Sequence, residues 1–150
     1  MNTLLLFGAI IAIAVISTAP ADAAAPAGRY VTTSTTVYDT KTKLTWQRTV
    51  TTTGYSWADA KTYCASAAVS AILGGTGRLP TVKELTTLVD YAANPPPAID
   101  LTAFPGTPAE VFWTSTAQLG STSVAWIIDF GPGVTKTDIV TDMDDVRCVR

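Results

Sequence analysis

Few residue types in this chain could do chemistry, because it has two cysteines, no histidine and only 15% charged residues. Without histidine, neither a Ser-His-Asp nor a Cys-His nucleophile system can form, and a histidine-based zinc site is excluded as well. General acid–base chemistry would fall to Asp, Glu, Lys or Tyr. No pair of carboxylates stands out by its spacing. The sequence therefore indicates a binding module rather than an enzyme, and we expect no catalytic residues.

Cys64 and Cys148 are the two cysteines, and such a pair in an exported chain most often forms a disulfide. Cys64 lies on the apolar face of a predicted helix, and Cys148 shares a strand face with Val146, so both thiols should point inward. The bond would close a loop of about 84 residues and contribute up to ~4.5 kcal/mol on the loop-entropy model. The alternative is a catalytic or redox thiol. Against it, the chain has no CxxC motif and no histidine partner.

An acidic cluster near the C-terminus, formed by Asp138, Asp142, Asp144 and Asp145, could offer oxygen ligands to calcium. Residues 141–145 lack the glycine and the terminal glutamate of an EF-hand loop, so we favour a solvated turn before the last strand. Asp138 and Asp142 are weak candidates for ligand binding. We expect no metal and no cofactor, with calcium as the disfavoured exception.

Three aromatic residues, Trp113, Trp126 and Tyr91, could stack on a sugar or another flat ligand. Aromatic residues in strands more often belong to the core, so these three are weak candidates for ligand binding. We assign Trp46 and Trp57 to the core.

The net charge of −2, without any run of Lys or Arg, argues against two classes of partner. Nucleic acid binding needs positive charge to displace the counterions of the phosphates. Polyanionic glycans are disfavoured for the same reason. The partner therefore stays an unknown ligand, either a glycan or a surface protein, and formation of an oligomer stays open.

The first 23 residues have the pattern of a signal peptide. The apolar run over residues 4–16 has about 13 residues, too short for a bilayer span of about 20. Small residues near Ala21 and Ala23 predict cleavage after Ala23. A buried core helix and an uncleaved membrane anchor are the alternatives, since residues 1–3 carry no Lys or Arg. Export would place the protein in the periplasm, on the cell surface or outside the cell, with no membrane span left after cleavage.

The elements that must position these residues follow an order of strands, helices and strands. After a short linker over residues 24–29, we expect one domain over residues 30–150. A hairpin is predicted over residues 37–48. Further strands are predicted over residues 111–116, 124–130, 134–140 and 146–150. This order is typical of an α+β domain with a small, mostly antiparallel sheet.

The first of two predicted helices begins after Ser56, a favourable N-cap, with Asp59 in its first turn. Its apolar positions recur at helical spacing as far as Ala71, and Gly74-Gly75 ends it.

The second predicted helix begins at a capping box formed by Thr81 and Glu84. Its apolar stripe continues to Ala92, and the prolines after Asn94 stop it. Arg78 precedes this helix, and we expect it to pair with a buried carboxylate such as Asp129 in a structural role.

Six short motifs, in order, carry a resemblance to a known family. They lie at residues 44–48 (LTWQR), 57–64 (WADA to Cys64), 77–85 (GRLPT to Glu84-Leu85), 112–115 (FWTS), 125–130 (AWIIDF) and 146–150 (VRCVR). Together they resemble the bacterial family named for the C-terminal domain of the collagen-like adhesin Lcl, long a domain of unknown function. That family is similar to the C-type lectin fold, of which sulfatase-modifying factors share a distant version. The resemblance implies two helices packed on a small antiparallel sheet, and a disulfide from the first helix to the last strand, in agreement with Cys64 and Cys148.

The resemblance also implies a ligand-binding or adhesive surface on the loops, without defining the ligand. C-type lectins hold sugars through calcium with a Glu-Pro-Asn or Gln-Pro-Asp loop and a Trp-Asn-Asp strand. This chain has neither motif, and residues 126–129 are only superficially similar. The best-known member binds sulfated glycans, but this chain has no basic patch. We expect a secreted or cell-surface binding module acting in adhesion or recognition; the alternatives are a structural or assembly subunit of a pilus or envelope complex and, less favoured, an enzyme.

Overall fold

Two small antiparallel sheets form the framework of the computed structural model, which describes residues 25–51 and 53–150. The predicted signal peptide over residues 1–23 lies outside the described residues. Within the described part, no helix has the length and apolar character needed to cross a membrane. The α+β class and the antiparallel pairing of the strands are confirmed, but the strands form two sheets where the sequence predicted one.

The first sheet has the order β1-β2-β3, with β1 at Tyr30–Thr32, β2 at Thr36–Asp39 and β3 at Thr45–Gln47. It contains the predicted hairpin, in which Val37 pairs with Trp46. Both side chains are buried, so the hairpin places one apolar face against the core.

The predicted first helix is two helices, α1 at Trp57–Cys64 and α2 at Ala67–Leu73. The hydroxyl of Ser66 accepts a hydrogen bond from the amide of Val69 and caps α2. A serine that binds the backbone in this way competes with continued helix, which explains the break. Gly74 ends α2 in the left-handed conformation, as its sequence position predicts.

The predicted second helix, α3, is much shorter than expected and spans only Val82–Thr86. Its capping box is confirmed, because Thr81 accepts from the amide of Glu84 and Glu84 accepts from the amide of Thr81. The hydroxyls of Thr86 and Thr87 bind the carbonyls of Val82 and Glu84, each at 2.7 Å. The apolar spacing beyond Thr86 therefore continues into an irregular turn, where Leu88 is still buried.

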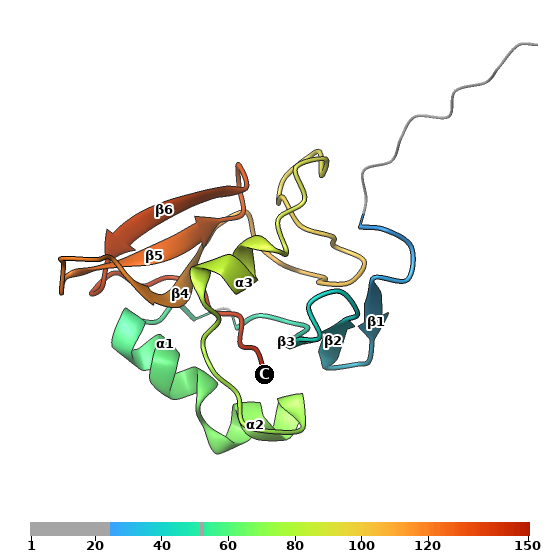
Figure 1. The fold of residues 1–150 in the computed structure, drawn as a ribbon, viewed down its shortest axis with the longest axis horizontal. Helices are drawn as coiled ribbons and strands as arrows, with labels where there is room; N and C mark the ends of the chain where they lie inside the picture. Colours follow the sequence, from blue (N-terminus) through green and yellow to red (C-terminus); the bar gives the residue numbers. More distant parts are fainter. Residues whose placement is uncertain (1–24, 52) are drawn as a thin grey trace, which may run out of the picture.

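The second sheet has the order β4-β5-β6, with β4 at Val111–Ala117, β5 at Val124–Asp129 and β6 at Val134–Ile139, and confirms three predicted strands. The predicted last strand over residues 146–150 is wrong as a regular strand. Val149 instead forms single bridges to Trp46 and to Arg78. Figure 1 shows this C-terminal segment ending between the two sheets, near α2 and α3.

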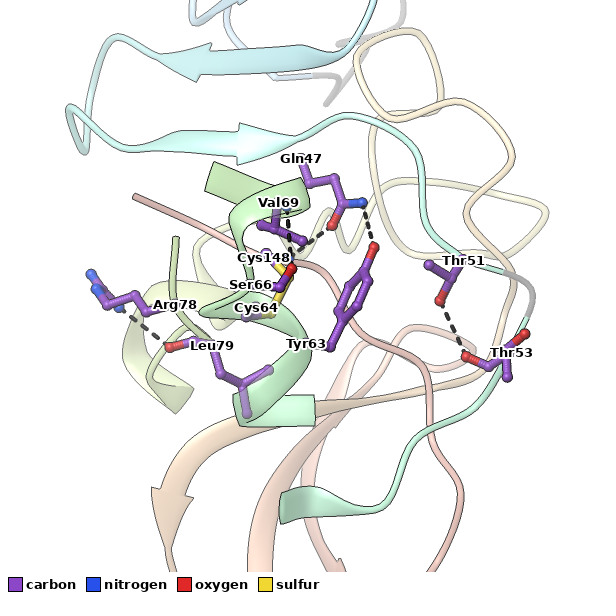
Figure 2. The surroundings of a disulfide bond; sticks show 10 residues. All are labelled: Gln47, Thr51, Thr53, Tyr63, Cys64, Ser66, Val69, Arg78, Leu79 and Cys148. Atoms are coloured by element: carbon purple, nitrogen blue, oxygen red, sulfur yellow. Dashed lines mark hydrogen bonds between the residues drawn. A yellow bond between two sulfur atoms is a disulfide. The ribbon is translucent and has the colours of Figure 1, made fainter. Parts of the chain in front are cut away.

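The core has two clusters of buried side chains, and β4 and β5 contribute to both. Trp46, Phe104, Phe112 and Phe130 belong to the first cluster. Leu73, Trp113 and the two cysteines belong to the second. A disulfide joins Cys64 at the end of α1 to Cys148, with an S–S distance of 2.05 Å, which confirms the predicted bond (Figure 2).

Candidate ligand-binding site

The three aromatic candidates differ sharply in how much of each side chain reaches the surface. Trp113 is 0% exposed, and its Nε1 donates to the carbonyl of Tyr55 at 2.7 Å. Trp113 is therefore removed from the weak candidates for ligand binding, because its ring belongs to the core, the alternative that the sequence favours. Trp126 is half-buried on β5, whereas Tyr91 is 76% exposed. Tyr91 is thus the aromatic candidate that a ligand can reach most freely.

Tyr91 lines a surface hollow of about 420 Å³, here called the Tyr91 hollow. Its walls come from the start of β1, from the turn after α3 and from the loop that follows. The residues used below are Arg29, Tyr30, Leu88, Asp90, Tyr91 and Asp100. The hollow therefore combines an open aromatic ring, two carboxylates and a guanidinium.

Arg29 fixes one wall of the Tyr91 hollow. Its guanidinium forms an ion pair with the buried carboxylate of Asp39 at 2.8 Å and donates to the carbonyl of Thr87 at 2.7 Å. Burial alone would raise the pKa of Asp39, but the hydrogen bonds from Arg29 and from the amide of Lys41 outweigh it and lower that pKa. The charge of Arg29 is therefore balanced by Asp39, and the guanidinium ties β1 to the end of α3.

The carboxylates of the Tyr91 hollow are held by backbone amides. Oδ1 of Asp90 accepts from the amide of Ala92 at 3.0 Å, and Oδ1 of Asp100 accepts from the amide of Thr102 at 2.8 Å. Burial raises the pKa of Tyr30 to about 12, so its phenol stays protonated at neutral pH. Fixed acceptors beside an exposed ring suit a ligand with hydroxyl donors and an apolar face.

The acidic cluster is only partly the solvated turn that the sequence predicts. Asp142 is exposed and Asp138 is half-buried at the end of β6, but Asp144 is only 7% exposed. Burial, followed by the charges of Asp138, Asp142 and Asp145, raises the pKa of Asp144 to about 7. Among residues 25–51 and 53–150, no group of three or more Asp, Glu, His or Cys side chains could hold a metal ion.

Arg78 does not pair with Asp129, which corrects that prediction. Its guanidinium forms a two-point contact with Glu84, at 2.6 and 2.8 Å. Asp129 instead pairs with Lys136 across the β5–β6 hairpin at 2.8 Å. The hydrogen bond from Arg78, which outweighs desolvation, lowers the pKa of Glu84 to about 2. Both contacts join residues close in sequence, so they support α3 and the hairpin locally.

Arg147 is the polar residue that sequence reasoning missed. Its side chain is completely buried, with Nη1 donating to the carbonyls of Gln47 and Arg48 at 2.7 and 2.8 Å. The guanidinium also lies 4.7 Å from the ring centre of Phe104. Both faces of residues 146–149 are covered, so the alternation that places Cys148 inside says nothing about Arg147.

The disulfide region is also held by polar contacts. Nε2 of Gln47 donates to the hydroxyl of Tyr63 at 3.1 Å, and Oε1 of Gln47 accepts from the amide of Cys148 at 3.4 Å (Figure 2). One side chain of β3 thus contacts both α1 and the segment of Cys148. These contacts stabilise the fold and lie apart from the Tyr91 hollow.

Comparison with known proteins bears on the family of the chain. No curated protein matches the chain by sequence. The family model of the Lcl C-terminal domain matches residues 35–150, which include the disulfide, all three helices and the second sheet. Since this match covers far more than half of the sequence, the chain belongs to the Lcl C-terminal domain family.

Proposed function

We propose that this protein is a non-catalytic recognition module that binds a neutral carbohydrate or a similar polyhydroxylated ligand in the Tyr91 hollow. The observation that carries the proposal is the exposure of Tyr91, at 76%, on the rim of a hollow of about 420 Å³. A tyrosine ring offers a large flat contact area at low entropic cost. Hydroxyl groups of the ligand would donate to Asp90 and Asp100.

The charge of the hollow supports a neutral ligand over a sulfated one. Asp90 and Asp100 contribute negative charge, while the guanidinium of Arg29 is already paired with Asp39. A sulfate group would therefore meet two carboxylates and no unpaired cation of the lining, which is electrostatically unfavourable.

A lectin-like fold, export and the absence of catalysis are parts of the same proposal. The disulfide from α1 to the C-terminal segment is consistent with a C-type lectin relative and with an oxidising compartment. The sequence has no histidine, and both thiols are used in the bond. Acting in the periplasm, on the cell surface or outside the cell, such a module would serve adhesion or recognition.

An array of neutral and sulfated glycans, probed with the protein and three variants, tests the proposal. We expect binding to neutral glycans, with Tyr91→Ala lowering affinity about tenfold or more because the stacking surface is lost. Tyr91→Phe should retain most of the affinity. Tyr38→Ala is the matched control, since Tyr38 is also exposed but does not line the hollow. Equal losses for Tyr91→Ala and Tyr38→Ala, or binding to sulfated glycans alone, would contradict the proposal.

A structural or assembly subunit of a pilus or envelope complex is the second candidate, favoured by one observation. Leu119, in the turn between β4 and β5, is 99% exposed, and Ile139 on β6 is also exposed. Exposed apolar side chains of this kind mark contact surfaces when they form a patch. Light scattering should then show an oligomer that Leu119→Ser dissociates; a monomer at all concentrations would favour the recognition module.

A further inference from the structure

A second hollow, of about 230 Å³, lies where the segment before α1 meets the C-terminal segment. It is lined by Gly54, Glu110, Val111, Met143, Asp144 and Asp145 and is here called the Asp144 hollow. Tyr55 and Asp144 pair through two backbone hydrogen bonds, of 2.9 and 3.1 Å. A Cβ atom on Gly54 would lie 2.6 Å from the carbonyl oxygen of Met143, so the glycine permits this close approach.

The other side of the Asp144 hollow is held by β4. The amide of Asp145 donates to the carbonyl of Val111 at 3.1 Å, and the amide of Trp113 donates to the carbonyl of Asp145 at 3.0 Å. Backbone contacts on both sides thus fix Asp144 and Asp145 in place. The hollow is a preformed feature of the fold rather than a gap between loose side chains.

Asp144 is a buried acid without a partner. The residue is 93% buried, since 7% is exposed, and no group in the described part of the chain donates to its Oδ2. The charges acting on it, from Asp138, Asp142 and Asp145, are all negative. Burial and the charge of Glu110 raise the pKa of Asp145, and the opposing charge of Arg147 does not cancel them. None of the three ion pairs found among the described residues involves an acid of this hollow. A buried carboxylate in such surroundings is costly unless a cation or donor reaches it.

The walls of the Asp144 hollow indicate what kind of cation fits. Val111 is half-buried, and Met143 is 64% exposed and contributes a flexible apolar side chain. A lining that combines apolar side chains with carboxyl groups matches a side chain with an alkyl stem and a charged head. A divalent metal fits less well, because no group of three acidic, histidine or cysteine side chains among the described residues could hold a metal ion.

We propose that the Asp144 hollow binds the side chain of a lysine from a partner polypeptide, with its ammonium group at Asp144 and Asp145 and its stem against Val111 and Met143. An ammonium carries three donors and no acceptor, so it suits a hollow whose ionisable side chains, Glu110, Asp144 and Asp145, are all carboxyl groups. The inference concerns a surface separate from the Tyr91 hollow and does not depend on the proposed function.

The protonation of Asp144 gives an independent consequence. Burial and the charges of Asp138, Asp142 and Asp145 raise the pKa of Asp144 to about 7. Glu110 and Tyr55 are also packed at the site, and the guanidinium of Arg147 acts on the neighbouring Asp145. A bound ammonium favours the ionised carboxylate. Affinity for a lysine side chain should therefore be higher at pH 8 than at pH 5.5.

Titration with Nα-acetyl-lysine methylamide, followed by the amide NMR signals of the protein, tests the inference. We expect shifts centred on Gly54, Met143, Asp144 and Asp145, and little effect from the neutral analogue Nα-acetyl-norleucine methylamide. Asp144→Asn should weaken binding about tenfold or more, as expected for loss of a charged hydrogen bond. Asp142→Asn is the matched control, because it removes the same charge two positions away at an exposed residue outside the hollow.

Three results would overturn the inference. The norleucine analogue binding as well as the lysine probe would show a merely apolar hollow. Equal weakening by Asp144→Asn and Asp142→Asn would show diffuse attraction by the acidic surface. Shifts of the same amides by calcium chloride, with none from the lysine probe, would show a metal site.

If Asp144→Asn does not fold, Met143→Ala at the exposed wall replaces it. This variant should lower the affinity for the lysine probe several-fold, and an unchanged affinity would count against the site.

Discussion

Arg147 shows how a single buried cation can organise several chain segments. Its guanidinium donates to the carbonyls of Gln47 and Arg48, at the end of β3, and to the hydroxyl of Thr107 at 2.6 Å. Within the described residues it has no ion-pair partner, and burial lowers its pKa to about 9. The carbonyl acceptors and the ring of Phe104 offset the free-energy cost of burying the charged guanidinium.

Replacing Arg147 by methionine tests this role. Arg147→Met keeps much of the volume but leaves two carbonyls and one hydroxyl without their donor, so we expect the free energy of unfolding to fall by about 2–4 kcal/mol. Urea denaturation measures the change. Arg150→Met is the control, because Arg150 is exposed and should change stability by less than ~0.5 kcal/mol. Equal effects of the two variants would refute the buried network.

Asp144 makes stability depend on pH. The pKa of its carboxyl is about 7 in the folded chain against an ordinary value of 3.8, so the folded state holds the proton more tightly. The contribution of Asp144 to the free energy of unfolding is therefore greatest below about pH 4, and it falls as the pH rises towards about 7. Asp144→Asn should remove this slope and raise the free energy of unfolding by about 1–3 kcal/mol at pH 8. Melting temperatures at pH 4.5 and pH 8 measure it; a constant difference between variant and parent would be contrary evidence.

At the scale of elements, local patterns in the sequence predict where helices begin better than where they end. Ser56, Ser66 and Thr81 each have a side chain that caps a helix, but only the first and third are flagged by sequence alone. The break at Ser66 is hidden because the alanines around it fit a continuous helix. The last segment is misjudged for a different reason: its bridges join residues about 70 to 100 positions apart, which no local pattern records.

The candidate site was predictable only in part. Tyr91 stands out as an aromatic residue, but the sequence gives no means of ranking it above Trp113, since exposure depends on which segments cover each ring. The walls of the Tyr91 hollow come from three separate segments, so their proximity is a property of the fold. Glu84 is closer to Arg78 in sequence than Asp129 is, and the capping box already places its carboxylate at the start of α3.

Ser66 provides the test at this scale. Ser66→Ala should lower the free energy of unfolding by about 1 kcal/mol, because the amide of Val69 loses its capping acceptor. Ser70→Ala, inside the same helix, should leave stability unchanged or raise it by up to ~0.5 kcal/mol, since alanine is the better helix former. Thermal or urea denaturation compares them. A loss of the same size at both positions would argue against a helix that begins at Ala67.

For the whole molecule, the C-terminal segment is the central connection. Residue Thr45 exchanges two backbone hydrogen bonds with Arg150, each of 2.9 Å, and Arg78 exchanges two with Val149. Asp145 contacts β4 in the second sheet, and Cys148 is bonded to α1. One segment of seven residues, 144–150, therefore contacts the first sheet, the second sheet and α1 (Figure 1).

The double variant Cys64→Ala/Cys148→Ala tests how much of this connection is covalent. We expect the free energy of unfolding to fall by about 2–5 kcal/mol, since the open chain gains conformational freedom. Chemical reduction of the parent should give a similar loss together with a mass increase of two hydrogens. A double variant as stable as the oxidised parent would mean that the noncovalent bridges alone close the domain.

The position of segment 144–150 also sets the order of events during biosynthesis. Every element that it joins is synthesised before it, so the two sheets cannot be locked together until the last residues of the domain have left the ribosome. If the chain is exported as proposed, a domain that stays open until this segment is made would suit a translocation channel that accepts only unfolded polypeptides, and the bond to Cys148 would close it afterwards.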